Sequence, residues 1–206
     1  MARFTVTAYN YSPNNWNLCS SYRFAPDPLL SLCVVQSYPF PRATSPATPG
    51  KQTFSWEPIF SFAALFHRHG HVGVINTTPA SAQLNATNII VDRDLIHFTQ
   101  TRQDAPEDFF MIETDRVPMP SGNHIGIGSF HTRTVCCFVK DTQPNSRYLF
   151  RPTGPLSIFF ASNSMTGSVI TPENESRMFD LNFPEGETNI EVSLTPQSVW
   201  QLGRMQ

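Results

Sequence analysis

At 206 residues the chain is long enough to bury one hydrophobic core, and β-sandwiches of this size commonly fold as one unit. Charged residues make up only 15% of the chain and the formal net charge is −2, whereas aromatic residues reach 12%. Because no stretch gathers arginine and lysine into the basic patch that phosphate groups require, these numbers exclude direct nucleic-acid binding from the expected functions. We therefore expect a single domain over residues 1–206.

The N-terminal sequence lacks the apolar core of a secretion signal, and no window approaches the roughly 18 apolar residues of a membrane span. We expect a soluble protein that is neither exported by a signal peptide nor embedded in a membrane. The four cysteines are Cys19, Cys33, Cys136 and Cys137, and without export they are expected to be reduced. Cys136 and Cys137 are adjacent in an apparent strand, so their side chains should point to opposite faces.

Strand patterns recur along the whole chain. Apolar and β-branched runs predict strands over residues 4–11, 30–38, 88–91, 95–101, 109–114, 125–130, 132–140, 156–161, 189–195 and 199–202. Proline and glycine separate them, with a proline-rich loop at 39–50 and a turn at 118–122. Short strands at such spacing predict an all-β fold, an antiparallel jelly-roll or related β-sandwich.

The clearest strand, residues 189–195, alternates strictly between polar and apolar positions and therefore has one buried face. Applying the same alternation to the other strands predicts a core that includes Val135, Cys137, Val139, Ile158, Phe160, Ile190, Val192 and Leu194.

Two short helices are also expected. Ser55 is placed to cap a helix that carries Pro58 in its first turn and ends at Gly70. A second helix is predicted over Pro172–Met178, where Thr171 precedes a proline and an acidic residue, a typical helix start.

A histidine-rich segment gives the first candidate for chemistry. In an extended segment His69 and His71 share a face and could direct two imidazoles toward one metal ion. Pro120–His124 resembles the second motif of the cupin family, and this resemblance implies a metal-dependent enzyme with His69, His71 and His124 as ligands. No acidic residue follows His71 within five positions, and the spacing from Gly122 to His124 is one residue short of the cupin pattern. Solvated or interface histidines are the alternative.

Aromatic side chains give the second set of candidates. Trp16 and Tyr22 could stack against sugar rings, which would make the protein a carbohydrate-binding β-sandwich. Subunit contact is the other interpretation, and it places interface residues at Tyr9, Tyr11, Trp16, Tyr38 and Phe40. No nucleophile elbow, Cys–His motif or phosphate-binding glycine loop is complete, so we expect no enzymatic activity and no cofactor.

The chain is rich in Phe, Pro, Ser, Thr and Asn, and only Lys51 and Lys140 are lysines, which is typical of surfaces covered by neighbours. With about eight strands and a helix expected near Trp56–Phe66, it resembles the jelly-roll structural proteins of small icosahedral viruses. The resemblance implies a coat, clamp or decoration subunit, found in the virion and in the host cytoplasm during assembly. Its partners would be copies of itself or other capsid proteins. In one respect this sequence differs from many coat proteins of RNA viruses, which carry a basic N-terminal arm, because its first residues have the pattern of a strand.

Overall fold

The computed structural model describes residues 2–25, 29–78, 81–82, 87–91, 97–116 and 121–205. Its regular elements are almost all strands, which confirms the all-β prediction. The first two residues of the strand predicted at 95–101, and residues 118–120 of the predicted turn, lie outside the described residues. Pro120, part of the cupin-like motif, lies outside them too.

The strands form four sheets, which we number I to IV. Sheet I has the order β17 (Trp200–Leu202), β16 (Asn189–Leu194), β1 (Phe4–Asn10) and β5 (Gly50–Trp56). Sheet II has the order β15 (Phe179–Asp180), β14 (Pro152–Ala161), β2 (Trp16–Phe24) and β4 (Gln36–Phe40). Sheet III has the order β3 (Leu30–Leu32), β12 (Thr134–Val139), β11 (Asn123–Ser129), β6 (Phe60–Arg68) and β7 (His71–Thr77). Sheet IV has the order β13 (Arg147–Phe150), β10 (Phe110–Thr114), β8 (Thr87–Val91) and β9 (His97–Arg102).

Most neighbouring strands pair antiparallel, as predicted. Two pairs are parallel: β1 with β16, where Val6 lies opposite Ile190, and β8 with β10, where Asn88 lies opposite Ile112. The fold is therefore an all-β architecture of largely antiparallel sheets, consistent with a β-sandwich, whereas the jelly-roll topology in particular stays a prediction.

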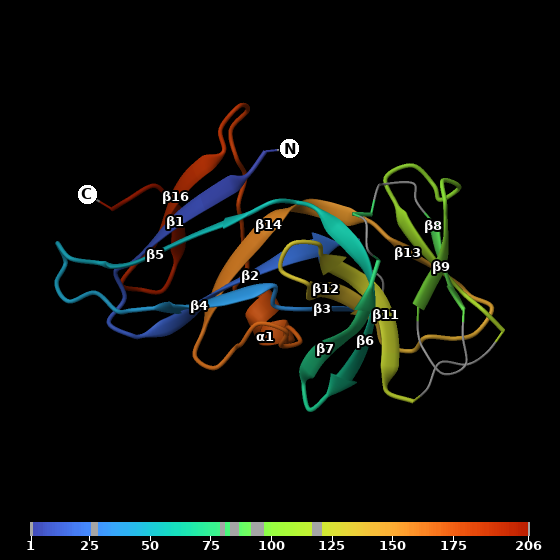
Figure 1. Ribbon diagram of the computed structural model, residues 1–206. Coiled ribbons are helices and arrows are strands. Elements are labelled where there is room, and N and C mark those ends of the chain that lie inside the picture. The colour runs from blue at the N-terminus through green and yellow to red at the C-terminus, as the bar shows by residue number, and fades with distance from the viewer. Residues whose placement is uncertain are drawn as a thin grey trace.

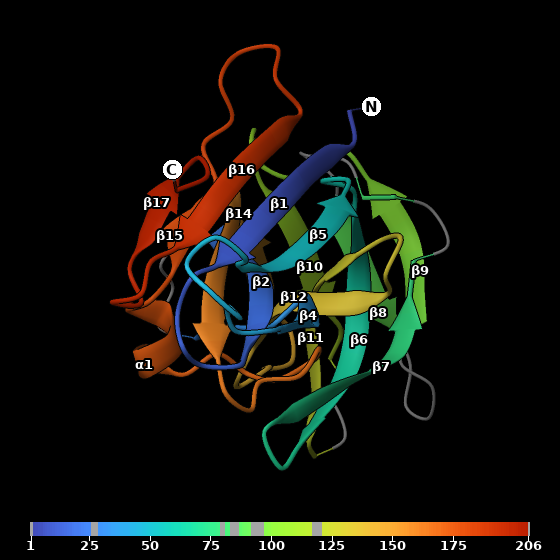
Figure 2. The ribbon, with the colours of Figure 1, turned by 90° about the vertical axis from the view of Figure 1, so that its left-hand side faces the viewer.

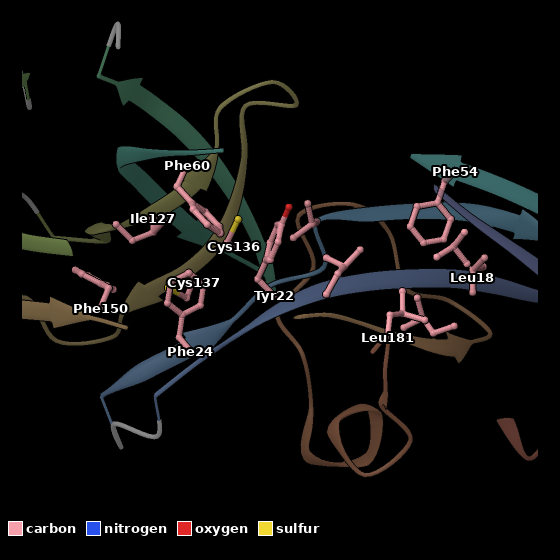
Figure 3. Packing of buried hydrophobic residues seen from close by; sticks show 14 of the residues in the cluster. Leu18, Tyr22, Phe24, Phe54, Phe60, Ile127, Cys136, Cys137, Phe150 and Leu181 are labelled. Carbon is pink, nitrogen blue, oxygen red and sulfur yellow. The ribbon is translucent and has the colours of Figure 1, made fainter. Parts of the chain in front are cut away.

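The sheets pack in two connected halves. Figure 1 shows sheet I against sheet II at one end of the molecule and sheets III and IV at the other, and Figure 2 shows the first end face on. One apolar cluster runs through both halves. In Figure 3 Tyr22 lies between its two parts, which are represented by Leu18, Phe54 and Leu181 on one side and by Phe60, Ile127 and Phe150 on the other.

The predicted core is confirmed at seven of its eight positions. Val192 and Leu194 in β16 are fully buried. The other five are fully or almost fully buried: Val135, Cys137, Val139, Ile158 and Phe160. Ile190 is half-buried and packs on the main cluster from its edge. Alternation therefore identified the buried face correctly, but it did not show where that face meets solvent.

The helix predicted from Ser55 to Gly70 is wrong. Ser55 lies in β5, opposite Thr5 of β1, and the following apolar run forms β6. Phe62 and Ala64 face the main cluster, whereas Ala63 and Leu65 face a smaller one on the other side of sheet III. A strand that is buried on both faces lacks a regular alternation of polar and apolar residues, so its sequence cannot be distinguished by periodicity from a buried helix.

The second helix is confirmed in shortened form as α1 (Pro172–Glu175). The Thr171 hydroxyl accepts a hydrogen bond from the Asn174 N–H at 3.3 Å, as expected of a capping residue. No helix within the described residues is long and apolar enough to cross a membrane.

The expected alternation of Cys136 and Cys137 is broken by a β-bulge. Cys137 pairs with Ile127 and Val135 pairs with Gly128, which leaves Cys136 as the extra residue of β12. Both side chains consequently join the main cluster rather than pointing to opposite faces. All four cysteines are buried and free of disulfide bonds in the structure, and their reduced state stays a prediction.

Candidate ligand-binding site

An apolar pocket of about 790 Å³ opens where the two halves of the molecule meet. Its walls come from the start of β1, the corner between β5 and β6, the first part of β14 and the segment 181–188. Tyr22, Phe60, Leu156 and Leu181 are buried residues of the main cluster, so the pocket reaches the hydrophobic core. Its size lies within the range of small-molecule sites, which is roughly 300–1,000 Å³.

Three aromatic rings form one wall of this pocket. Phe4 and Trp56 stack with ring centroids 5.7 Å apart and an interplanar angle of 25°. Phe183 meets both rings edge-on, at 5.0 Å from Phe4 and 5.6 Å from Trp56. Their contact follows from strand register, because Phe4 at the start of β1 lies directly opposite Trp56 at the end of β5. The three half-buried rings offer faces and edges to a bound ring.

The segment 181–188 is fixed to the sheets at both ends. The Leu181 N–H donates to the Leu156 carbonyl at 3.1 Å, and the Thr5 N–H donates to the Thr188 carbonyl at 2.8 Å. Between them a turn is closed by the hydrogen bond from the Glu187 N–H to the Pro184 carbonyl. The wall that carries Phe183 is therefore held in place before any ligand arrives, which lowers the entropy lost on binding.

Few of the side chains that line the pocket are polar. Asn182 and Glu187 are exposed lining residues, while the buried Tyr22 donates its hydroxyl hydrogen to the Glu57 carbonyl at 3.3 Å. Burial raises the pKa of the Tyr22 phenol, with a smaller contribution from Cys136, so Tyr22 is neutral at physiological pH. With Tyr22 neutral, Glu187 is the one side chain among the described lining residues that carries a charge.

The five predicted interface residues lie at one end of the molecule, in sheets I and II. Phe40 is buried against Trp200, and Tyr9 is buried with its hydroxyl donating to Glu191 Oε1 at 2.7 Å. Tyr11, Trp16 and Tyr38 are half-buried. Phe40 and Tyr9 therefore serve the chain's own packing, and the predicted interface rests on the other three.

Trp16 lines a second depression, a groove of about 650 Å³ beside α1. The Trp16 ring lies 5.0 Å from Phe160, which lies 6.1 Å from Trp200. The groove is also lined by the apolar residues Met178, Phe179 and Val199 and by the polar residues Asn14, Ser176, Arg177 and Ser198. The two residues predicted to stack on sugars are thus separated, because Trp16 lies in this groove and Tyr22 in the apolar pocket.

The structure does not assemble the predicted three-histidine site. His69 lies in the turn between β6 and β7 with a positive φ of 52°, and His71 in β7 is exposed near Gly167. His124 in β11 instead lies beside His67, and burial lowers the pKa of the His124 imidazole. Among the described residues, no three His, Cys, Asp or Glu side chains are grouped to hold a metal ion.

The comparisons with known proteins give one match. The family model of RhiA matches residues 1–204, nearly the whole chain. No curated protein and no solved structure matches the chain.

Proposed function

The chain belongs to the RhiA family, and for this member we propose a non-catalytic binding function, in which the apolar pocket takes a small, uncharged molecule that contains a ring. The observation that carries this proposal is the pocket itself, with three mutually packed aromatic rings on a wall that is fixed at both ends. Pockets of this kind bury most of a small ligand and use a few rim groups to orient it.

The charge of the lining sets the class of ligand. The exposed lining residue Glu187 repels anions, while the buried part of the lining penalises any charge that enters without a partner. A neutral aromatic or alicyclic molecule avoids both costs. The lining supplies contact surface rather than reacting groups, since the Tyr22 phenol is held neutral and bonded to a backbone carbonyl, and this supports a non-catalytic role.

The test is a titration with N-phenyl-1-naphthylamine, a neutral fluorophore whose emission rises in apolar surroundings. We expect saturable binding to one site, with energy transfer from Trp56 that the Trp56→Phe variant reduces. Phe183→Ala should weaken binding roughly tenfold, the factor that corresponds to about 1.4 kcal/mol of lost contact. The matched control is Leu149→Ala, which removes an exposed side chain of β13 outside the pocket.

Two outcomes would overturn the proposal. One is fluorescence that rises without saturation, as for non-specific adsorption. The other is a Phe183→Ala titration that superimposes on those of the wild type and Leu149→Ala, with all three proteins folded by circular dichroism.

The groove beside α1 favours carbohydrate binding as a second candidate function. Trp16 and Trp200 present aromatic surface on which a sugar ring can stack, and Asn14 and Ser198 are exposed or half-exposed at its edge. Saturation-transfer NMR with a panel of neutral mono- and disaccharides would test it. We expect transfer to at least one sugar that Asn14→Ala reduces and that Asn145→Ala, a change at a distant exposed turn, leaves intact. Absence of transfer across the panel would rule this candidate out.

A further inference from the structure

Two histidines lie side by side on one face of sheet III. His124 in β11 lies opposite Leu65 in β6, and His67 follows two positions later, on the same face as Leu65. The imidazole centroids are 6.2 Å apart. Both rings border Phe138 of the neighbouring strand β12, at 5.4 Å for His67 and 5.3 Å for His124.

Each of these rings has a nitrogen that the protein leaves unsatisfied. His67 Nε2 and His124 Nδ1 are shielded from solvent, and neither has a hydrogen-bond partner. A neutral imidazole has one N–H donor and one lone-pair acceptor, and leaving such a group buried and unpaired destabilises the fold. The two neighbouring rings thus each keep one nitrogen available to a partner from outside the chain.

The charged side chains near His67 and His124 are compatible with a cation bound between the two strands. Arg68 points to the other face of β6, where its guanidinium lies over the Phe66 ring at 5.9 Å. Lys140 lines a separate depression together with Arg23. Asp141 is the nearby acidic group, and its charge favours a cation at His124.

We propose that His67 and His124 together bind one divalent transition-metal ion of the zinc, nickel or copper class, with water completing its coordination. Bonds of about 2.0–2.1 Å place such an ion roughly 3 Å from each ring centre, so the two ring centres would lie about 5 Å apart at a tetrahedral N–metal–N angle and about 6 Å apart at a linear one. From the 6.2 Å found here, the rings would move together by about 1 Å to hold an ion in tetrahedral geometry. Imidazole nitrogens suit these metals better than magnesium or calcium. The proposal is independent of the apolar pocket, which lies elsewhere on the molecule.

Such an ion would connect β6 to β11 near the β6–β7 turn. The two ligands come from strands that are already paired, so the site requires adjustment of side chains only. With the proton of each ring on its other nitrogen, one ion would accept a lone pair from both orphaned nitrogens at once.

Isothermal titration of tag-free protein with ZnCl₂, and separately with NiCl₂, tests this site. We expect one equivalent to bind to the wild type, and binding to weaken by roughly tenfold or more in His67→Ala and in His124→Ala. His131→Ala is the matched control, because His131 is an exposed histidine paired with Glu57 at 2.9 Å. Circular dichroism establishes that each variant is folded, and His67→Gln and His124→Gln replace any alanine variant that is not.

Nitrogen-15 NMR of the histidine rings gives a readout that does not depend on affinity. On addition of Zn²⁺ the resonances of His67 Nε2 and His124 Nδ1 should shift, whereas those of His69, His71 and His131 should not. The proposal is overturned by the absence of stoichiometric binding, by binding that both single variants retain, or by shifts confined to the other histidines.

Discussion

Gly126 in β11 lies so close to Cys137 in β12 that a Cβ atom at Gly126 would overlap the Cys137 carbonyl oxygen. The same Cβ would stand 2.9 Å from the Cα of Phe138. These obstacles are backbone atoms of the paired strand, so they can move only if the pairing of β11 with β12 is distorted. Glycine is required here for close backbone approach, not for its conformational freedom.

Gly126→Ala should therefore destabilise the protein by about 3 kcal/mol, the upper range for overpacking a core. The contrast is Gly73→Ala in β7, where the added Cβ would meet only the ring of Phe66, an exposed side chain that can swing away. For that variant we expect a change within about 1 kcal/mol. Urea denaturation of the three proteins measures the difference, and equal stabilities of the two variants would contradict this account.

Local patterns were enough to predict the all-β class, the strand over 189–195, the capping residue Thr171 and most of the core. They failed where burial differs from simple alternation. β2 was missed because Ser20 and Ser21 are buried within it, the latter with its hydroxyl donating to the Cys33 carbonyl. β6 was mistaken for a helix because both of its faces are buried.

The candidate site could not be predicted in the same way. Phe4, Trp56 and Phe183 are far apart in sequence, and they meet only through the pairing of β1 with β5 and the attachment of segment 181–188 to β1. His124 was selected as a metal ligand, but its neighbour His67 was not, because the register of β6 with β11 was unknown.

The role as a viral coat, clamp or decoration subunit rests on composition and the expected order of strands and helix, and it stays a prediction.

The four cysteines should be inert in the folded protein. Burial raises the pKa of the Cys19 thiol to about 11, an effect that a contact with Ser37 partly opposes, and burial also raises the pKa values of Cys33, Cys136 and Cys137. At pH 8 the reactive thiolate is therefore scarce at each of them. We expect fewer than one thiol per chain to react with Ellman's reagent within minutes under native conditions, and four in guanidinium chloride. Rapid native reaction of two or more would contradict this burial.

Glu113 forms the most enclosed ion-pair network among the described residues. Its carboxylate contacts Arg102 and Arg147, each at 2.6 Å, and it is 16% exposed. Glu113→Gln removes the charge that both guanidinium groups contact and leaves Arg102 with its weaker pair to Asp104 at 3.2 Å, so the free energy of unfolding should fall by roughly 2 kcal/mol. Glu173→Gln, which breaks the exposed pair with Arg177, should cost less than about 0.5 kcal/mol. Similar losses in thermal or urea unfolding would show that the network contributes no more than a surface pair.

The core prediction is tested most directly at Val192. This side chain is fully buried in β16, between neighbours β1 and β17, and belongs to the main cluster. In Val192→Asp a carboxylate would enter that cluster without a charged partner, which destabilises by several kcal/mol or forces the group to be protonated. Because protonation relieves part of the penalty, the loss of stability relative to wild type should be smaller at pH 5 than at pH 8.

The matched control is Val199→Asp, the same exchange at a valine that is 59% exposed in the turn before β17. It should change stability by no more than about 0.5 kcal/mol at either pH, because its carboxylate stays in water. Urea denaturation at the two pH values separates the variants. If Val192→Asp unfolded like Val199→Asp, residue 192 would face solvent, and the alternation of residues 189–195 would place the opposite face of β16 in the core.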